Sequence, residues 1–228
     1  MDSPSISFLV TTHNEPQVEV LLQKLRERLN TNPQDEVVIL DDFSTDEAFL
    51  KILEKWKAEP GFSVHQHKLD GDFAAHKNYG TDLCQKDFVF QIDADEYPAR
   101  TLLDNITFVL AQNPTVEMFR VPRVNIVRGL TAEHAKKWMW NVCKLPEFGD
   151  LPIVNWHHGD YQSRIYKRSP EIRWKKKLHE TISGQTSASE FPLYTDFALC
   201  HDKTIERQEA QNDFYNKNWD AKANMGLG

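Results

Sequence analysis

The sequence has little of several features that would assign it to a specialised class of protein. It has only three cysteines, Cys84, Cys143 and Cys200, and no Cys-x-x-Cys pair, so neither a disulfide framework nor a cysteine zinc site is predicted. No hydrophobic run approaches the roughly 20 residues that a membrane-spanning helix needs. The N-terminal residues also lack the basic start of a secretory signal. We therefore expect buried free thiols and a cytoplasmic protein.

Positive charge is also scarce. The 34 Asp and Glu residues outnumber the 27 Lys and Arg residues, which gives a formal net charge of −7 with His neutral. This balance argues against a protein that coats nucleic acid, although net charge does not describe local patches. With 40% hydrophobic and 27% charged residues, the chain has the composition of a globular protein, and it is long enough to bury a full core.

The first hundred residues alternate between apolar runs and amphipathic stripes. Apolar runs predict strands at 6–10, 36–40, 62–67 and 88–92. Apolar residues at helical spacing predict helices at 18–29, 47–56 and 72–84. This β-α-β-α-β-α-β order predicts an α/β fold, an open and mostly parallel sheet flanked by helices, whose ligands bind beyond the carboxyl ends of the strands.

The second half follows a different pattern. It contains an alternating strand at 119–127, a Trp- and Lys-rich stretch at 136–140 and a long irregular region. Further strands are predicted at 161–166 and 172–174, and a closing helix at 205–219. Because no linker separates the halves, we expect the second half to be an elaboration of the same domain.

Polar loops follow three of the predicted strands, at 11–15, at 41–42 and at 93–96. One acidic turn alone is more often simply solvated. Parallel strands bring their carboxyl ends to one edge of a sheet, however, so the three loops together predict one site. Asp93 and Asp95, two carboxylates separated by one residue, can face one hard cation such as Mg²⁺ or Mn²⁺.

Four motifs, in this order and spacing, resemble the nucleotide-sugar half of a GT-A-fold, family-2-type inverting glycosyltransferase. They are Thr-Thr-His-Asn-Glu at 11–15, Leu-Asp-Asp-Phe-Ser-Thr-Asp at 40–46, Gly-x-Phe-x-x-x-Lys-Asn-x-Gly at 71–80 and Asp-Ala-Asp-Glu at 93–96. The segments 164–168, 172–174, 178–180 and 197–201 are similar to the acceptor side of a subgroup with a late His-Glu motif. The resemblance implies a Rossmann-like GT-A fold with a nucleotide-sugar-binding half, 1–110, and an acceptor-binding and catalytic half, 111–228.

The resemblance also implies roles on the donor side. Thr11 and Asp42 match positions that hold the base of the donor, and a carboxylate that accepts the uracil N3–H would favour UDP, with another pyrimidine or guanine left open. Lys77 stands where the family often has Arg, so a cation remains near the diphosphate but bidentate geometry is lost. The other donor-side candidates are His13, Glu15, Asp93, Arg164 and His179, while His76 and Asn78 are either donor contacts or helix surface.

The implied reaction is an inverting transfer of a hexose or pentose from a nucleoside-diphosphate sugar to a hydroxyl group. It needs a general base and a group that stabilises the departing diphosphate. Glu180 falls where the family places the base. Asp95 matches the metal-ligating carboxylate, and His201 suits a further ligand position better than His179, with a core histidine as the alternative. Mn²⁺ or Mg²⁺ would act as a Lewis acid.

The acceptor side carries the excess positive charge. Seven cations and one anion lie between Arg164 and Lys177, and they form either a solvated edge or a surface for a phosphate or an anionic acceptor. Lys175, Trp138 and Trp140 are the candidates for acceptor binding, although a tryptophan can equally belong to a core. The implied acceptor is a saccharide or, in a phage-type enzyme of a bacterial host, a hydroxymethylated DNA base.

Two other classes of function fit parts of the sequence. A Mg²⁺-dependent nucleotidyltransferase also places carboxylates at strand ends, but it should carry a glycine-rich phosphate loop, and the 11–16 loop has no glycine. A non-catalytic module that binds nucleotide sugars or nucleic acid would share the binding residues without the chemistry.

Overall fold

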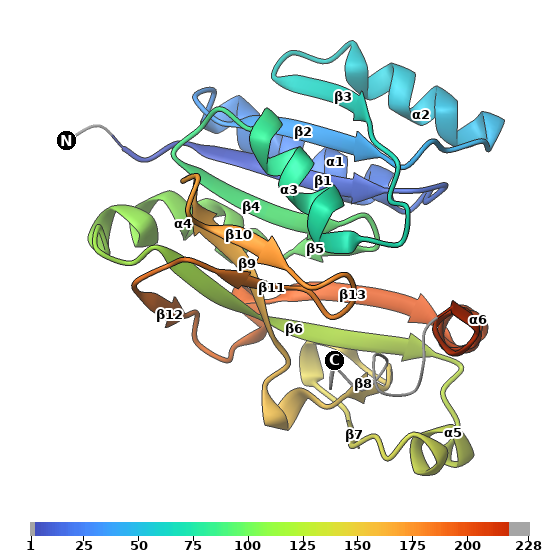
Figure 1. The fold of residues 1–228 in the computed structure, drawn as a ribbon. Helices are drawn as coiled ribbons and strands as arrows, with labels where there is room; N and C mark the ends of the chain where they lie inside the picture. The colour runs from blue at the N-terminus through green and yellow to red at the C-terminus, as the bar shows by residue number, and fades with distance from the viewer. Residues whose placement is uncertain (1–2, 219–228) are drawn as a thin grey trace.

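The computed structural model describes residues 3–218, and one large sheet runs through them (Figure 1). Its first half has the predicted alternation: β1 (Ile6–Thr12), α1 (Val18–Thr31), β2 (Glu36–Asp41), α2 (Glu47–Lys57), β3 (Phe62–Gln66), α3 (Phe73–Leu83) and β4 (Phe88–Asp93). These strands lie side by side in the order β3-β2-β1-β4 and are all parallel. The predicted α/β fold with a mostly parallel sheet is therefore confirmed.

The part of the chain after β4 extends the same sheet with mixed directions and adds a separate two-stranded sheet, the β10–β11 hairpin. Its strands are β5 (Glu96–Pro98), β6 (Met118–Arg128), β7 (Val142–Cys143), β8 (Ile153–Val154), β9 (Tyr161–Lys167), β10 (Arg173–Lys175), β11 (Thr181–Ser183), β12 (Ala188–Glu190) and β13 (Leu199–Thr204). Its helices are α4 (Arg100–Gln112), α5 (Ala132–Lys137) and α6 (Ile205–Asn218). Strand β9 runs antiparallel between β4 and β6, and β13 runs parallel to β6. The end of the predicted closing helix, residue 219, lies outside the described residues.

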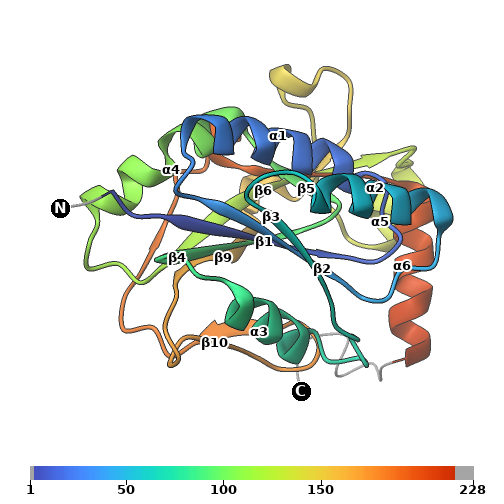
Figure 2. The same ribbon diagram turned by 90° about the horizontal axis from the view of Figure 1, so that it is seen from above.

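The sheet is covered on both faces (Figure 2). Helices α1, α2 and α4 lie on one face, while α3 and the antiparallel β10–β11 hairpin lie on the other. Alternate residues of β1 follow this division: Ile6 and Phe8 join the core under α1, and Leu9 joins the core under α3. Gly80 allows α3 to approach closely, because a Cβ there would lie 2.6 Å from Leu9 Cδ1.

Helix α6 lies beyond the carboxyl end of β1 in both views (Figures 1 and 2). It follows β13 directly and is anchored by Ile205 and Gln208, which are both buried. The last helix therefore lies next to the loops that follow the first and fourth strands, where Arg207 contacts Glu15 and Asp95.

Two sequence-based expectations concern cysteines and membrane segments. Cys84 and Cys200 are buried free thiols as expected, and burial raises the pKa of Cys84 to about 12. Cys143 differs, because it lies on the short strand β7 near the surface and is only half-buried. Within residues 3–218, none of the helices combines the length and the apolar character that crossing a membrane requires.

Candidate active site

A cavity of about 620 Å³ opens where β1, β2 and β4 end. Parallel pairing brings these ends together, since Thr11 is the register partner of Asp93 and Thr12 that of Asp41. This cavity is lined by all the residues that the sequence assigned to donor binding, to the metal ion or to the role of general base. They are Thr11, His13, Glu15, Asp42, Lys77, Asp93, Asp95, Arg164, His179, Glu180 and His201. The structure thus gathers these residues at one site, while their individual roles stay predictions.

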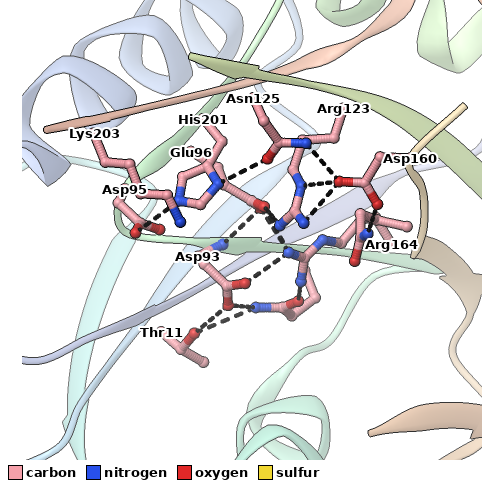
Figure 3. Close-up of polar contacts among 12 residues, drawn as sticks. Thr11, Asp93, Asp95, Glu96, Arg123, Asn125, Asp160, Arg164, His201 and Lys203 are labelled. Atoms are coloured by element: carbon pink, nitrogen blue, oxygen red, sulfur yellow. Dashed lines mark hydrogen bonds and ion pairs between the residues drawn. The ribbon is translucent and has the colours of Figure 1, made fainter. Parts of the chain in front are cut away.

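Asp93 is held by four side chains, of which Figure 3 labels Thr11 and Arg164. Its carboxylate accepts hydrogen bonds from Thr11 at 3.1 Å, from Gln91 at 2.8 Å and from Arg164 at 2.6 Å, and it lies 3.5 Å from the Lys77 ammonium. Burial pushes the pKa of Asp93 upward, but the charges of Arg164 and Lys77 outweigh it and hold that pKa well below its ordinary value. Asp93 is therefore an ionised carboxylate in a fixed orientation.

Glu96, the last residue of the acidic motif, has a structural role that the sequence did not reveal. It is only 1% exposed and accepts hydrogen bonds from Arg123 at 2.9 Å and from Arg164 at 2.8 Å. Arg123 also pairs with Asp160 at 2.8 Å (Figure 3). A charged residue inside the apolar strand β6 was the available signal for Arg123, but its two partners lie far away in sequence.

His201 and Asp95 face one another, with Nε2 3.1 Å from Oδ2 (Figure 3). The other ring nitrogen, Nδ1, lies 3.1 Å from Oδ1 of Asn125, whose Nδ2 donates to Asp160 at 2.7 Å. Because the Asn125 Oδ1 only accepts, Nδ1 of His201 must carry a proton. In this tautomer the Nε2 lone pair and the Asp95 carboxylate point at one another, an arrangement in which both atoms can serve as ligands to one cation.

The Asp95–His201 pair fits a divalent cation. It offers one carboxylate oxygen and one imidazole nitrogen, and the Asn125 contact orients the ring as partners of metal-bound histidines do. Burial raises the pKa of Asp95, but the hydrogen bond and charge of His201 outweigh it and lower that pKa to about 2. Among residues 3–218, no three His, Cys, Asp or Glu side chains form a ready metal cluster. Water and phosphate oxygens would have to supply the remaining ligands.

Glu180, the predicted base, lies between β10 and β11 and accepts a hydrogen bond from Lys77 at 2.5 Å. The Lys77 ammonium also lies 4.7 Å from the ring centroid of Trp174. Asn78 exchanges two hydrogen bonds with the backbone of Trp174, at 2.9 and 3.0 Å. Asn78 therefore anchors the hairpin to α3, a contact that neither alternative from the sequence, donor contact or helix surface, had included.

The end of the cavity near β2 contains residues that are predicted to bind the nucleobase of the donor. One oxygen of Asp42 accepts a hydrogen bond from the backbone N–H of Leu69 at 2.9 Å, which orients the carboxylate. His13 contacts the Asp42 carbonyl oxygen at 2.7 Å. His76 lines the cavity although it is nearly buried, and its Nδ1 lies 3.2 Å from Nδ1 of His67. Burial and the neighbouring His67 lower the pKa of His76 to about 4.

The predicted acceptor-binding residues lie outside this cavity. Trp140 lines a second cavity of about 510 Å³, which shares Arg123 and Lys203 with the first. Trp138 stacks on His134 and lines neither cavity. Lys175 is exposed on β10 and also lines neither cavity. Only Trp140 is thus placed next to the predicted chemistry, and all three assignments stay predictions.

The cationic segment is not one continuous exposed patch. Arg164, which the sequence grouped with it, is 3% exposed because its guanidinium is drawn inward by Asp93 and Glu96. Arg173 pairs with Asp82 at 2.6 Å. The exposed remainder is Lys167 and Arg168 at one end and Lys175–Lys177 at the other.

Arg207 is a cavity residue that sequence reasoning missed. It lies in the first turn of α6 and contacts both Glu15, in the loop after β1, and Asp95, at 3.3 Å. No local motif marks it, because its partners are more than a hundred residues away.

Comparisons with known proteins agree with this architecture. The family model described as glycosyl transferase family 2 matches residues 7–192. The poly(ribitol-phosphate) β-N-acetylglucosaminyltransferase TarS from Staphylococcus aureus strains Mu50 and MW2 is 30% identical over 122 residues, which are 52% of this chain and 21% of TarS. The chain thus matches about a fifth of the length of these curated relatives.

Solved structures of S. aureus TarS 1–349 share the fold. The complex with UDP-GlcNAc aligns with a TM-score of 0.61 and 18% identity over 87% of this chain and 58% of that one. A second structure of TarS 1–349 gives a TM-score of 0.60 over 93% and 62% of the two chains.

Proposed function

Because the chain belongs to glycosyl transferase family 2, we propose that it transfers a sugar from a UDP-linked donor to a hydroxyl acceptor with inversion. The observation that carries the proposal is the meeting of Asp42, the Asp95–His201 pair and Glu180 in one cavity. The name of the similar TarS, and its structure with UDP-GlcNAc, support a uridine donor.

The donor lies across the carboxyl ends of β2, β1 and β4 in this proposal. The Asp42 oxygen that does not accept from Leu69 takes the uracil N3–H, and Thr11 contacts the base. Lys77, buried beside Asp93, faces the diphosphate. Residues 1–110 thus provide the donor half and residues 111–228 the acceptor half.

Asp95 and His201 hold Mn²⁺ or Mg²⁺ in this proposal. The cation, when bound, supplies Lewis-acid stabilisation of the leaving diphosphate. Asn125 keeps the His201 ring in the orientation that presents Nε2. Arg164 and Arg123 fix the surrounding carboxylates, so that little reorganisation is needed when the donor binds.

Glu180 acts as the general base in this proposal. Its carboxylate removes the proton from the acceptor hydroxyl as the oxygen attacks the sugar, on the side opposite the diphosphate, which inverts the anomeric centre. The contact with Lys77 fixes the position of the Glu180 carboxylate in the cavity.

The acceptor enters from the side of Trp140. The second cavity carries this indole together with Asn155, Asp160 and Gln208, a set that suits stacking on and hydrogen bonding to a saccharide or polyol. A hydroxymethylated DNA base is the second candidate, favoured by the exposed Lys175–Lys177 run. Loss of transfer with rising salt would distinguish DNA from a neutral saccharide.

Binding of nucleotide sugars with and without Mn²⁺ tests the proposal. A UDP-sugar at a hundred times its Kd should stabilise the protein by about 2.7 kcal/mol. Asp95→Ala should abolish the part of this stabilisation that depends on Mn²⁺. Glu180→Gln should keep donor binding but lower the rate of sugar transfer about a hundredfold or more. Asp104→Ala, at an exposed site, is the control. If no nucleotide sugar stabilises the protein, or if both site variants retain full transfer, the proposal is wrong.

A further inference from the structure

Arg207 bridges two acidic side chains from different loops of the candidate site. Its guanidinium contacts Oε2 of Glu15 and lies 3.3 Å from Oδ2 of Asp95. The Arg207 side chain is 38% exposed, whereas those of Glu15 and Asp95 are 10% and 21% exposed. Arg207 therefore reaches from the surface helix into the cavity that it lines.

The Asp95 oxygen that Arg207 approaches is the one that faces His201. Oδ2 of Asp95 lies 3.1 Å from Nε2 of His201 and 3.3 Å from Nη2 of Arg207. In the absence of a metal ion, Arg207 thus supplies positive charge at the oxygen that a divalent cation would bind. A metal ion at this oxygen and the guanidinium would repel one another, because both are cations.

Helix α6 is anchored by buried residues next to Arg207, whose side chain is 38% exposed. Ile205 and Gln208 are buried on either side of Arg207, and the Lys203 ammonium donates to Gln211 at 3.2 Å. A change of partner therefore needs only rotation about the side-chain bonds of Arg207, without movement of the helix.

We propose that Arg207 exchanges partners during donor binding: it competes with the divalent cation for Asp95 in the free protein and binds the diphosphate of a nucleoside diphosphate once the metal is present. This inference rests on the proposed function. The anion that arrives with the metal is the natural new partner, since a guanidinium binds phosphate oxygens through charge-assisted hydrogen bonds. Arg207 is thus a binding residue with opposite effects on the metal alone and on the metal–nucleotide complex.

Calorimetry with MnCl2 alone, and with UDP at saturating MnCl2, tests the opposite signs. In Arg207→Gln, Mn²⁺ should bind about fivefold more tightly, because a partly exposed ion pair that competes for Asp95 is removed. UDP should bind about tenfold more weakly, because a charge-assisted hydrogen bond is lost. Arg207→Lys should lie between the wild type and Arg207→Gln in both titrations.

Arg100→Gln is the matched control, since Arg100 is an exposed arginine that pairs with Glu27 and Asp104 away from the cavity. It should change neither titration. If Arg207→Gln weakens both ligands, or changes neither, the partner exchange is refuted while the proposed function stands. If the wild type binds UDP neither with nor without Mn²⁺, the proposed function fails and the inference fails with it.

Discussion

Replacing Arg164 by leucine should lower the free energy of unfolding, because it breaks buried ion pairs at the candidate site. Arg164 is 3% exposed, and its guanidinium hydrogen-bonds Asp93 at 2.6 Å and Glu96 at 2.8 Å. Removing one partner of a buried ion pair costs about 3–5 kcal/mol, because a charge is left uncompensated. The Asp93 side chain is 34% exposed and keeps Lys77, whereas Glu96 is 1% exposed and keeps only Arg123 of its two arginines, so most of the cost should come from Glu96.

This change in the free energy of unfolding can be measured from unfolding curves in urea and from melting temperatures. For a chain of this size about 1 kcal/mol corresponds to a shift of about 2–4 °C, so Arg164→Leu should lower the Tm by about 10 °C. Glu96→Gln removes the buried carboxylate that would be left with Arg123 alone, and the double variant should recover about 1–3 kcal/mol relative to additivity. Arg100→Leu, in an exposed pair, should cost less than about 1 kcal/mol. Strict additivity, or a cost for Arg164→Leu as small as that control, would refute the reasoning.

Three further outcomes are expected. The low pKa of His76, about 4, keeps it neutral in the folded protein, whereas the unfolded chain gains a proton below about 6.5. The free energy of unfolding should therefore fall by about 2 kcal/mol between pH 7 and pH 5. In urea titrations at the two pH values, His76→Asn should remove this contribution to the pH dependence. Trp140→Ala should raise the acceptor KM about tenfold with donor hydrolysis unchanged, if stacking contributes about 1–1.5 kcal/mol. Gly80→Ala should cost about 1–3 kcal/mol, measured in urea, because its Cβ would overlap Leu9.

The fold and the position of the cavity at the strand ends follow from patterns that are local in sequence. The alternation of apolar runs and stripes determines the order β1-α1-β2-α2-β3-α3-β4, and parallel pairing then places Thr11 opposite Asp93. The strand-end loops reach a common edge as a consequence of topology. No knowledge of individual side-chain contacts is needed for that step.

Contacts between residues far apart in sequence could not be predicted in this way. Arg164 belongs to a basic run of the sequence, yet the buried carboxylates of Asp93 and Glu96 draw it inside. Arg207 shows no motif, and its role depends on the path by which β13 delivers α6 to the loop after β1. The partner of each arginine depends on which carboxylate lies within reach after folding, and the order of residues along the chain does not contain that information.

The pairing of charges at the site has a consequence for how the donor binds. Asp93 and Glu96 each contact arginine, Asp95 contacts His201 and Arg207, and Glu180 contacts Lys77. The acid excess of the whole chain is therefore locally compensated around the cavity. A nucleotide diphosphate and a divalent cation also compensate one another, so their joint arrival leaves the local charge nearly unchanged and requires only that partners be exchanged. Either ligand alone would leave a charge uncompensated in the cavity. We therefore expect UDP and Mn²⁺ to bind cooperatively, and we expect this coupling to decrease when the charge of Arg207 is removed.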